Sequence, residues 1–173
     1  MSLKGLLLDF GDTLVEESRG ISIPLSQAEL NPTEHSEQIL RGLSKGLVLG
    51  VISNTFTADD DDIRDALERV GLLRFVQTVV TSVSCGYAKP DSEIYHLALE
   101  RLALSASEVI MVGDRLDTDI LGASLLGMHS IHLRWPGRPG GLGEDGDHSP
   151  TAEIESLSEL PGAIDLVAPL LGE

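Results

Sequence analysis

The chain has little cysteine, few aromatic residues and little positive charge. Its 173 residues include one cysteine, 3% aromatic residues, and 12 lysine and arginine residues against 28 aspartate and glutamate residues, for a formal net charge of −16. A single cysteine cannot form an internal disulfide or supply a set of zinc ligands. The excess of acidic residues argues against nucleic acid and against an anionic membrane surface as partners, because both require clustered cations.

Long apolar runs are absent as well. No run reaches the roughly 18 residues of a transmembrane helix, and charges interrupt the N-terminal stretch after Leu8. We therefore expect no membrane span, no signal peptide and a cytoplasmic location. Hydrophobic residues nevertheless make up 42% of the chain, which is enough for a buried core and excludes wholesale disorder. The length fits a single domain, which we expect to span residues 1–173.

Short apolar runs alternate with longer stretches of helical period. The runs are apolar on both faces, as strands buried in a parallel sheet are. They predict strands over residues 6–8, 47–52, 76–80, 109–112 and 130–133, with a weaker candidate at 152–154. The stretches between them predict helices over residues 33–44, 59–70, 91–102, 118–126 and 158–171, the last broken near Pro161 and Pro169. This alternation predicts an α/β protein with a three-layer Rossmann-like fold, in which helices cover both faces of a parallel sheet of five to six strands.

Two segments fit neither pattern. Residues 15–31 are mixed in character and include Pro24, so we expect a flap or small lid within a reduced cap region at 15–45. Residues 136–150 contain five glycines and three prolines, a composition that predicts a mobile loop.

Polar side chains follow the predicted strands at their carboxyl ends, where open parallel sheets bind ligands. Clustered carboxylates repel one another unless a cation holds them, and oxygen ligands suit Mg²⁺. A hydroxyl, an amide and an ammonium beside that cation would hold a phosphoryl group. The pattern therefore predicts metal-assisted phosphoryl chemistry. The residues at this edge are Asp9, Asp12, Thr13, Ser53, Asn54, Thr55, Ser82, Lys89, Gly113, Asp114, Asp117 and Asp119.

These residues belong to four motifs that resemble those of the haloacid dehalogenase-like hydrolases, in the same order along the chain. The motifs are LDFGDTL at 8–14, VISN at 51–54, CGYAKPDSEIY at 85–95 and VGDRLDTDI at 112–120. The resemblance covers residues 3–135 and is closest to the branch that includes phosphoglycolate phosphatases. It implies a Mg²⁺-dependent hydrolase that cleaves phosphate monoesters through an aspartyl-phosphate intermediate.

The resemblance also implies roles for single residues. Asp9 would be the nucleophile that attacks phosphorus. Ser53 and the backbone N–H of Asn54 would hold phosphoryl oxygens, and Lys89 would neutralise both the nucleophile and the phosphate.

The metal ligands follow from the same resemblance. Asp9, Asp114 and the backbone carbonyl of Gly11 would bind Mg²⁺. Asp119 would support the metal or its waters. Asp117 is then an extra acid without a counterpart in the family.

Two features depart from the family pattern. The family carries a general acid–base aspartate two residues after the nucleophile, where this chain has Gly11. Asp12 is the candidate replacement, although an extended segment would turn adjacent side chains to opposite sides and so point Asp12 elsewhere. Only about 33 residues separate Asp12 from Gly46, too few for the family's usual helical cap. An open site suits bulky or macromolecular substrates, or closure by another subunit of a homo-oligomer. We expect the substrate to be a small phosphorylated metabolite or a bulkier phosphorylated molecule.

Three other functions fit parts of this pattern. Gly11 favours a weakened family member that binds phosphate as a regulatory module. The same glycine fits a relative that cleaves carbon–halogen or carbon–phosphorus bonds. A receiver domain also has an acidic pocket with a lysine, but its phosphoacceptor follows the third strand, where this chain has Thr81 and Ser82. We therefore discount the receiver domain.

Several residues also have simpler explanations. Ser53 and Asn54 are good helix N-cap residues, and the four acids at 59–62 fit a solvated helix start. Trp135 fits either the floor of a substrate pocket or a structural position. Packing accounts best for Cys85, His129 and His132.

Overall fold

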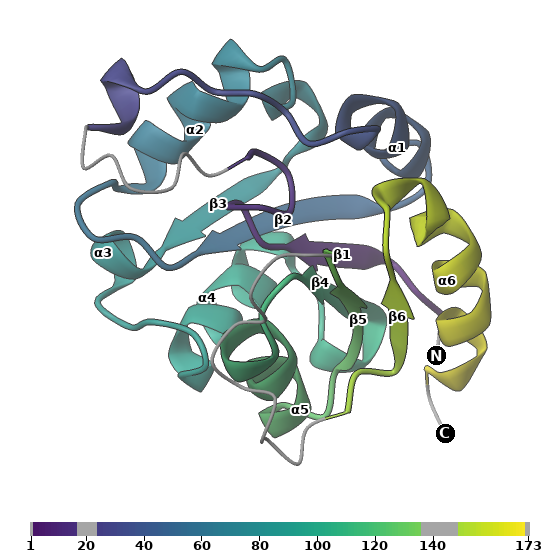
Figure 1. Ribbon diagram of the computed structural model, residues 1–173. Helices are drawn as coiled ribbons and strands as arrows, with labels where there is room; N and C mark the ends of the chain where they lie inside the picture. The colour runs from purple at the N-terminus through teal and green to yellow at the C-terminus, as the bar shows by residue number, and fades with distance from the viewer. Residues whose placement is uncertain (1, 17–23, 136–148, 172–173) are drawn as a thin grey trace.

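Six parallel strands form one sheet through the middle of the molecule (Figure 1). The computed structural model describes residues 2–16, 24–135 and 149–171. The strand order is β3-β2-β1-β4-β5-β6, and each neighbouring pair is parallel. The predicted Rossmann-like α/β class is confirmed, including the weaker sixth strand. The strands are β1 (Gly5–Leu8), β2 (Val48–Ser53), β3 (Thr78–Thr81), β4 (Val109–Gly113), β5 (His129–Leu133) and β6 (Ala152–Ile154).

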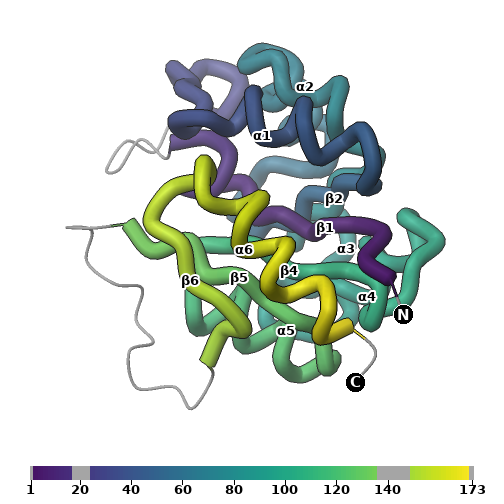
Figure 2. The backbone as a smooth tube through the Cα atoms, turned by 90° about the vertical axis from the view of Figure 1, so that its right-hand side faces the viewer, coloured from purple at the N-terminus to yellow at the C-terminus, as the bar shows by residue number. Residues whose placement is uncertain are grey.

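Helices cover both faces of this sheet (Figures 1 and 2). One face carries α1 (Ser36–Leu43), α2 (Asp60–Arg69) and α6 (Leu160–Val167), and their apolar side chains join one buried cluster. The other face carries α4 (Ser92–Leu102) and α5 (Leu121–Leu125), whose apolar side chains join a second cluster. The described residues therefore form the three layers that the sequence predicts.

The central strands are buried on both sides. Leu6 and Leu8 of β1 point into the first cluster, whereas Leu7 points into the second. The same alternation in β4 places Ile110 and Met111 on opposite faces. This two-sided burial explains why the strands read as continuous apolar runs rather than as alternating ones.

Short turns of helix differ from the sequence prediction. α3 (Ser82–Cys85) was not predicted, because four residues are too few to show a helical period. A π-helical turn, η4 (Leu116–Ile120), precedes α5, so this helix is shorter than the predicted 118–126. The predicted 158–171 helix consists of α6 between two short 3₁₀ turns, η5 (Leu157–Glu159) and η6 (Ala168–Leu170). The other 3₁₀ turns are η1 (Leu25–Gln27), η2 (Leu73–Phe75) and η3 (Ala106–Glu108).

Part of the segment that the sequence identifies as a flap is anchored to the domain. The Arg69 guanidinium at the end of α2 donates hydrogen bonds to the carbonyls of Leu25 (2.9 Å) and Ala28 (2.5 Å). Residues 17–23 lie outside the described residues, so a lid function stays a prediction. Residues 136–148 of the predicted mobile loop at 136–150 also lie outside them.

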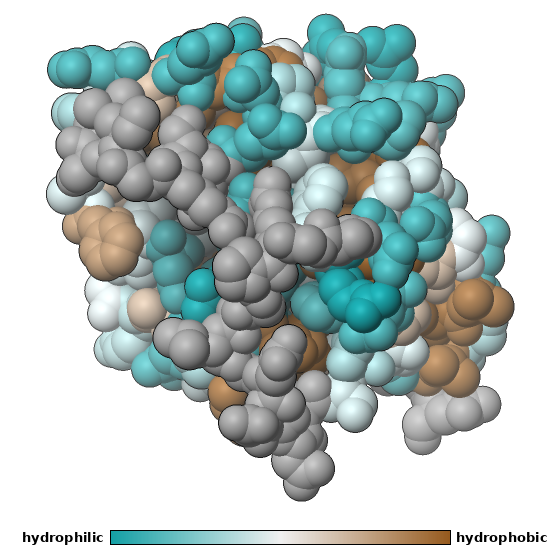
Figure 3. Space-filling model, in the orientation of Figure 1, coloured by the Kyte–Doolittle hydropathy of each residue, from teal (hydrophilic) through white to brown (hydrophobic). Residues whose placement is uncertain are grey.

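The described residues on one face of the molecule are mainly hydrophilic (Figure 3). On the face drawn in Figure 3, apolar residues form small separate groups among hydrophilic ones. None of the helices within the described ranges is long and apolar enough to cross a membrane. The large apolar side chains that are exposed in these ranges are Phe56, Val83, Tyr87, Leu125, Leu166 and Leu170.

The strand order determines where a ligand can bind. Chain order runs outward from β1 through β2 to β3 on one side, and from β4 through β5 to β6 on the other. The reversal lies between β1 and β4, and Rossmann-like sheets bind ligands outside the carboxyl ends of the strands at such a point. The loops that follow β1 and β4 are therefore the first place to look for a site.

We predict that Gly122→Ala destabilises the protein. A Cβ atom at position 122 would lie 2.3 Å from the hydroxyl oxygen of Tyr95, which is fully buried in the second cluster. Overpacking of this kind costs about 1–3 kcal/mol, measurable by urea denaturation. Gly162→Ala in α6 is the matched control, because a Cβ atom there meets nothing within 4 Å. Equal loss of stability in the two variants would contradict the packing argument.

Candidate active site

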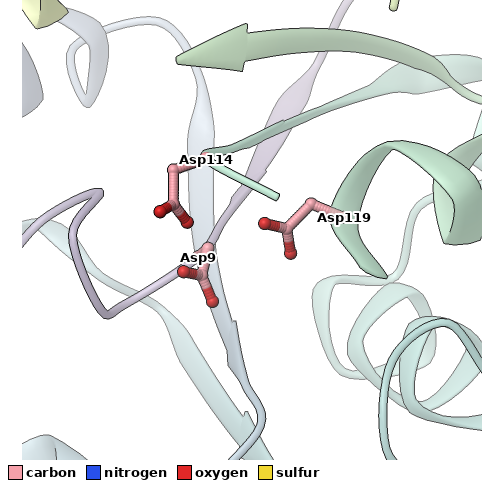
Figure 4. A group of neighbouring side chains, drawn as sticks. All are labelled: Asp9, Asp114 and Asp119. Atoms are coloured by element: carbon pink, nitrogen blue, oxygen red, sulfur yellow. The ribbon is translucent and has the colours of Figure 1, made fainter. Parts of the chain in front are cut away.

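Asp9 and Asp114 follow the adjacent strands β1 and β4. Leu8 is in register with Val112, and the Asp9 N–H donates to the Val112 carbonyl (2.9 Å). Carboxylate oxygens of Asp9, Asp114 and Asp119 all lie within 4.8 Å of one another (Figure 4). The structure thus brings three of the acids singled out by the sequence together at the reversal point of the sheet.

The carboxylate of Asp119 is fully buried, and three neighbours place it. The Tyr95 hydroxyl donates to the carbonyls of Thr118 (2.9 Å) and Asp119 (3.2 Å), which fixes the backbone of η4. The backbone N–H of Arg115 donates to Asp119 Oδ2 (3.1 Å). Gly113 leaves the necessary space, because a Cβ atom there would lie 2.2 Å from Asp119 Oδ2. The side chain of Asp119 can therefore turn back over β4 toward Asp9.

Lys89 completes the group. Its buried ammonium donates to Asp9 Oδ1 (2.5 Å), to Asp119 Oδ1 (2.7 Å) and to the Ile52 carbonyl (3.0 Å). An ammonium has three N–H donors, so each has an acceptor. One side chain therefore links the ends of β1, β2 and η4.

Asn54 holds the backbone of Lys89 in place. The Lys89 N–H donates to Asn54 Oδ1 (2.7 Å), and Asn54 Nδ2 donates to the Lys89 carbonyl (2.8 Å). The N-cap explanation for Asn54 is wrong, because α2 begins at Asp60 with Asp59 as its N-cap. The side chain of Asn54 instead joins the loop after β2 to the segment that carries Lys89.

Ser53 is the last residue of β2 and is buried. Val51, two residues earlier, is in register with Leu8 of β1. Ser53 therefore lies at the same edge of the sheet as Asp9, which directly follows Leu8.

The loop after β1 is a tight turn. The N–H groups of Leu14 and Val15 donate to the Phe10 carbonyl (2.9 and 3.1 Å), and the Asp12 N–H donates to the Val15 carbonyl (2.7 Å). Asp12 adopts a left-handed backbone conformation, with φ 54°, which costs a non-glycine residue about 1–2 kcal/mol. The extended segment assumed for Asp12 is therefore wrong. Asp12 is only 5% exposed, and its charge contributes to the raised pKa of Asp114.

Burial and neighbouring negative charges raise the pKa values of two of these aspartates. Loss of hydration raises the pKa of Asp9 from 3.8 to about 8; Lys89 opposes this change, and Asp119 and Asp114 add to it. Burial, then Asp119 and Asp12, raise the pKa of Asp114 to about 7 against the effect of Lys89. The pKa of Lys89 is itself raised, because Asp119 and Asp9 outweigh its loss of hydration.

The donor set fits a hard divalent cation. Several carboxylates share the charge of Lys89, and burial first and acidic neighbours second raise the pKa values of Asp9 and Asp114. A divalent ion would relieve the repulsion, and carboxylate and carbonyl oxygens are ligands that Mg²⁺ prefers. The residues that could hold it are Asp9, Asp114 and Asp119, whose oxygens already lie together.

Other acids that the sequence places nearby have separate partners. Asp117 accepts two hydrogen bonds from the Arg115 guanidinium (3.1 and 2.7 Å) and lies outside the carboxylate group. Asp59 accepts from the N–H groups of Asp61 and Asp62 (3.0 Å each), as the helix-start explanation predicts.

Sequence reasoning missed how three side chains support the site. Asn54 holds Lys89 through its amide, Tyr95 holds η4, and the Trp135 indole N–H donates to the Asp12 carbonyl (2.7 Å). The residues in these three contacts lie 35, 23 and 123 positions apart in the chain. No local pattern could pair residues at such separations.

Comparison with known proteins shows the family and a similar fold. The family model for the haloacid dehalogenase-like hydrolases matches residues 8–133, a range that contains Asp9, Ser53, Asn54, Lys89, Asp114 and Asp119. An uncharacterized protein from Listeria monocytogenes serotype 4b has a similar structure, with a TM-score of 0.84 and 25% identity over 95% of this chain and 98% of that one.

Two curated relatives bear the names of phosphatases. Glyceraldehyde 3-phosphate phosphatase of Methanocaldococcus jannaschii is 37% identical over 107 residues, which cover 61% of this chain and 46% of that protein. Pyrimidine 5'-nucleotidase YjjG of Escherichia coli is 33% identical over 132 residues, which cover 75% and 55%. The chain therefore spans about half the length of these relatives.

We predict that the metal-free protein loses stability as the pH rises from 5 to 8. In the unfolded chain Asp9 and Asp114 ionise near 3.8, whereas their folded-state pKa values are about 8 and about 7. Their contribution to stability is thus complete below pH 4 and is lost as the pH rises through these folded values. Each group contributes a slope of up to about 1.4 kcal/mol per pH unit.

The measurement is urea denaturation in the presence of a chelator at several pH values. Asp9→Asn is the comparison, because it removes one of the two ionisations while keeping the shape of the side chain. Its slope should be smaller than that of the native chain. Parallel pH profiles for the two proteins would contradict the raised pKa of Asp9.

Proposed function

The chain belongs to the haloacid dehalogenase-like hydrolases, and from this membership we propose that it is a Mg²⁺-dependent phosphatase that hydrolyses phosphate monoesters. The observation that supports this proposal best is the group formed by the buried Asp9 and Asp119 and the half-buried Asp114 around Lys89 at the reversal point of the sheet. It combines a carboxylate nucleophile, a fixed cation and oxygen ligands for a metal.

The proposed metal ligands are Asp9, Asp114 and the backbone carbonyl of Gly11. Mg²⁺ bound there would neutralise phosphate charge and stabilise the transition state. Asp119 has a supporting role in this proposal, because its two oxygens accept hydrogen bonds from Lys89 and from the Arg115 backbone. It orients Lys89 and stabilises the loop that carries Asp114.

Asp9 is the proposed nucleophile. A carboxylate must be ionised to attack phosphorus, and Lys89 favours the ionised form of Asp9 through a 2.5 Å hydrogen bond. In the first step an Asp9 oxygen forms a bond to phosphorus while the bond from phosphorus to the ester oxygen breaks, and the leaving oxygen takes a proton. In the second step water cleaves the aspartyl-phosphate, which releases phosphate and restores the carboxylate.

The phosphoryl group would be held by Ser53, the backbone N–H of Asn54 and the charge of Lys89. Asn54 has a double use in this proposal. Its side chain is occupied with the Lys89 backbone, so only its main chain is left to contact the phosphate. The same residue thus places the lysine and contributes a donor.

Proton transfer is where this chain differs from its family. Gly11 has no side chain to protonate the leaving oxygen, and Asp12 is the remaining candidate in the loop. Its burial near Asp114 keeps it within the charged group rather than in solvent. Gly11 favours a second candidate function, a phosphate-binding protein with weak turnover, and turnover measurements separate the two.

Cleavage of carbon–halogen bonds is a less suitable alternative. Dehalogenation in this family needs no Mg²⁺, whereas here Asp9 and Asp114 have pKa values raised to about 8 and about 7 by burial and by acidic neighbours. A site of this kind favours metal-dependent chemistry. An assay of turnover with and without Mg²⁺ separates the two functions. With phosphonates as substrates, the same assay tests cleavage of carbon–phosphorus bonds.

The proposal also includes a class of substrate. Relatives named for glyceraldehyde 3-phosphate and for pyrimidine 5'-nucleotides support a small phosphorylated metabolite. A reduced cap at 15–45, within one domain over residues 1–173, would also admit a bulkier phosphorylated substrate or closure by a second subunit. We propose a cytoplasmic setting.

Asp9→Asn should abolish hydrolysis of p-nitrophenyl phosphate. The variant keeps the side-chain shape but removes the nucleophile and one charge on the metal, so we expect a loss on the order of 10³-fold or more. Native activity should also require Mg²⁺ and disappear with a chelator. Asp117→Asn is the matched control, because Asp117 pairs with Arg115 outside the carboxylate group. Activity of more than a few per cent in Asp9→Asn would exclude the proposed mechanism.

Aryl phosphates should be cleaved faster than alkyl phosphates. An alkoxide needs a proton as it leaves, whereas p-nitrophenolate does not, and a positioned acid is worth about 10²–10⁴-fold in rate. Gly11→Asp should therefore raise the turnover of alkyl phosphates more than that of aryl phosphates.

Asp12→Asn tests whether Asp12 supplies the proton in the native chain. Loss of activity confined to alkyl substrates would assign that role to Asp12. Equal loss on both classes would show that Asp12 acts on the site as a whole.

A further inference from the structure

The end of β5 contacts both loops that carry the proposed metal ligands. The Trp135 indole N–H donates to the Asp12 carbonyl (2.7 Å), and His132 Nε2 lies 3.2 Å from the Asp114 carbonyl. Both contacts are made to backbone carbonyls, so neither uses the carboxylates of these aspartates. One strand end thus supports the loop after β1 and the loop after β4.

Trp135 is anchored independently of the loop that it contacts. The Arg134 N–H donates to the Ile154 carbonyl (2.8 Å), which extends the pairing of β5 and β6 by one residue. The Trp135 ring packs against the first apolar cluster. The indole therefore provides a fixed point at the edge of the sheet.

The loop of residues 10–15 is held to the domain at several points: Phe10, Leu14 and Val15 are buried in the first cluster, and the Thr33 N–H donates to the Leu14 carbonyl (2.9 Å). Its internal hydrogen bonds join Phe10, Asp12 and Val15, so they define the shape of the turn but not its position beside β4. Thr33 Oγ1 donates to the Thr13 carbonyl (2.8 Å) on one side, and Trp135 holds Asp12 on the other. Asp12 is also the residue with the left-handed backbone, where the turn is easiest to relax.

We propose that Trp135 is a positioning residue for the metal site, which holds the Asp12 carbonyl and thereby keeps Gly11 and Asp12 beside Asp114. The inference rests on the proposed function, because the metal site is part of that function. Loss of the indole N–H weakens metal binding through the loop after β1, while Ser53 and Lys89, which lie on other elements, keep their places.

Trp135→Phe tests this role, because phenylalanine keeps an aromatic ring and lacks the N–H donor. Two measurements are needed. Hydrogen exchange of the peptide covering residues 10–15, without metal, reports whether the loop is held; we expect faster exchange than in the native chain. The Mg²⁺ concentration at the midpoint of thermal stabilisation reports metal binding; we expect it to rise roughly tenfold, as for other residues that orient metal ligands.

Arg134→Gln is the matched control, because Arg134 is the neighbour of Trp135 in the chain. The substitution breaks the exposed pair between Arg134 and Glu155 and leaves the contact between Trp135 and Asp12 intact. It should match the native chain in both measurements. Trp135 is the only tryptophan in the sequence, so benzothienylalanine supplied in place of tryptophan replaces this residue alone. This analogue keeps the shape of the indole without its N–H and should reproduce the effects of Trp135→Phe, which guards against a packing effect of the smaller ring.

The outcomes separate this inference from the proposed function. Unchanged exchange in residues 10–15, or an unchanged Mg²⁺ midpoint, in both Trp135 replacements would overturn the role of Trp135 while leaving the native response to Mg²⁺ intact. A native chain that shows no response to Mg²⁺ at all would instead overturn the proposed metal requirement, and this inference with it.

Discussion

Lys89 donates hydrogen bonds to Asp9 and Asp119 inside the protein, and the geometry of the site depends on this contact. Burial of an unpaired charge costs several kcal/mol, so neither carboxylate nor ammonium would be stable there alone. Each of the three charged groups comes from a different element of the fold. The contact can therefore form only when β1, η4 and the segment after α3 are all in place, and it links the site to the integrity of the domain.

The charge balance of this group also explains how a strongly acidic chain could bind an anionic substrate. With a formal net charge of −16, the surface as a whole repels phosphate. Lys89 lowers the pKa values of Asp9 and Asp114, but burial first and acidic neighbours second outweigh this effect. A divalent cation would turn the same group from repulsive to attractive for phosphate, and the acids that create the repulsion are the ligands that would hold the cation.

Close packing behind the site positions these charges. Gly113 admits the Asp119 carboxylate, and Gly122 admits the Tyr95 ring, whose hydroxyl fixes the backbone of η4. Trp135 plays a comparable part on the other side, where it contacts the loop after β1. These residues do not themselves carry the chemistry. They restrict the backbone so that the acids and the lysine meet at the distances that the chemistry needs.

The sequence by itself determined the Rossmann-like fold class, the six strands and most of the helices, because the hydrophobic period is a local property of a chain. It also determined that Asp9, Asp114, Asp119 and Lys89 converge, because their positions after the strands can be read from the sequence. It misjudged the backbone around Asp12, since the turn is closed by hydrogen bonds that residue types do not specify. Only the tertiary structure decided that Lys89 bridges two carboxylates, that Asn54 holds Lys89, and that Trp135 reaches Asp12. These contacts join residues 30 to 123 positions apart, and their partners are chosen by the packing of whole layers.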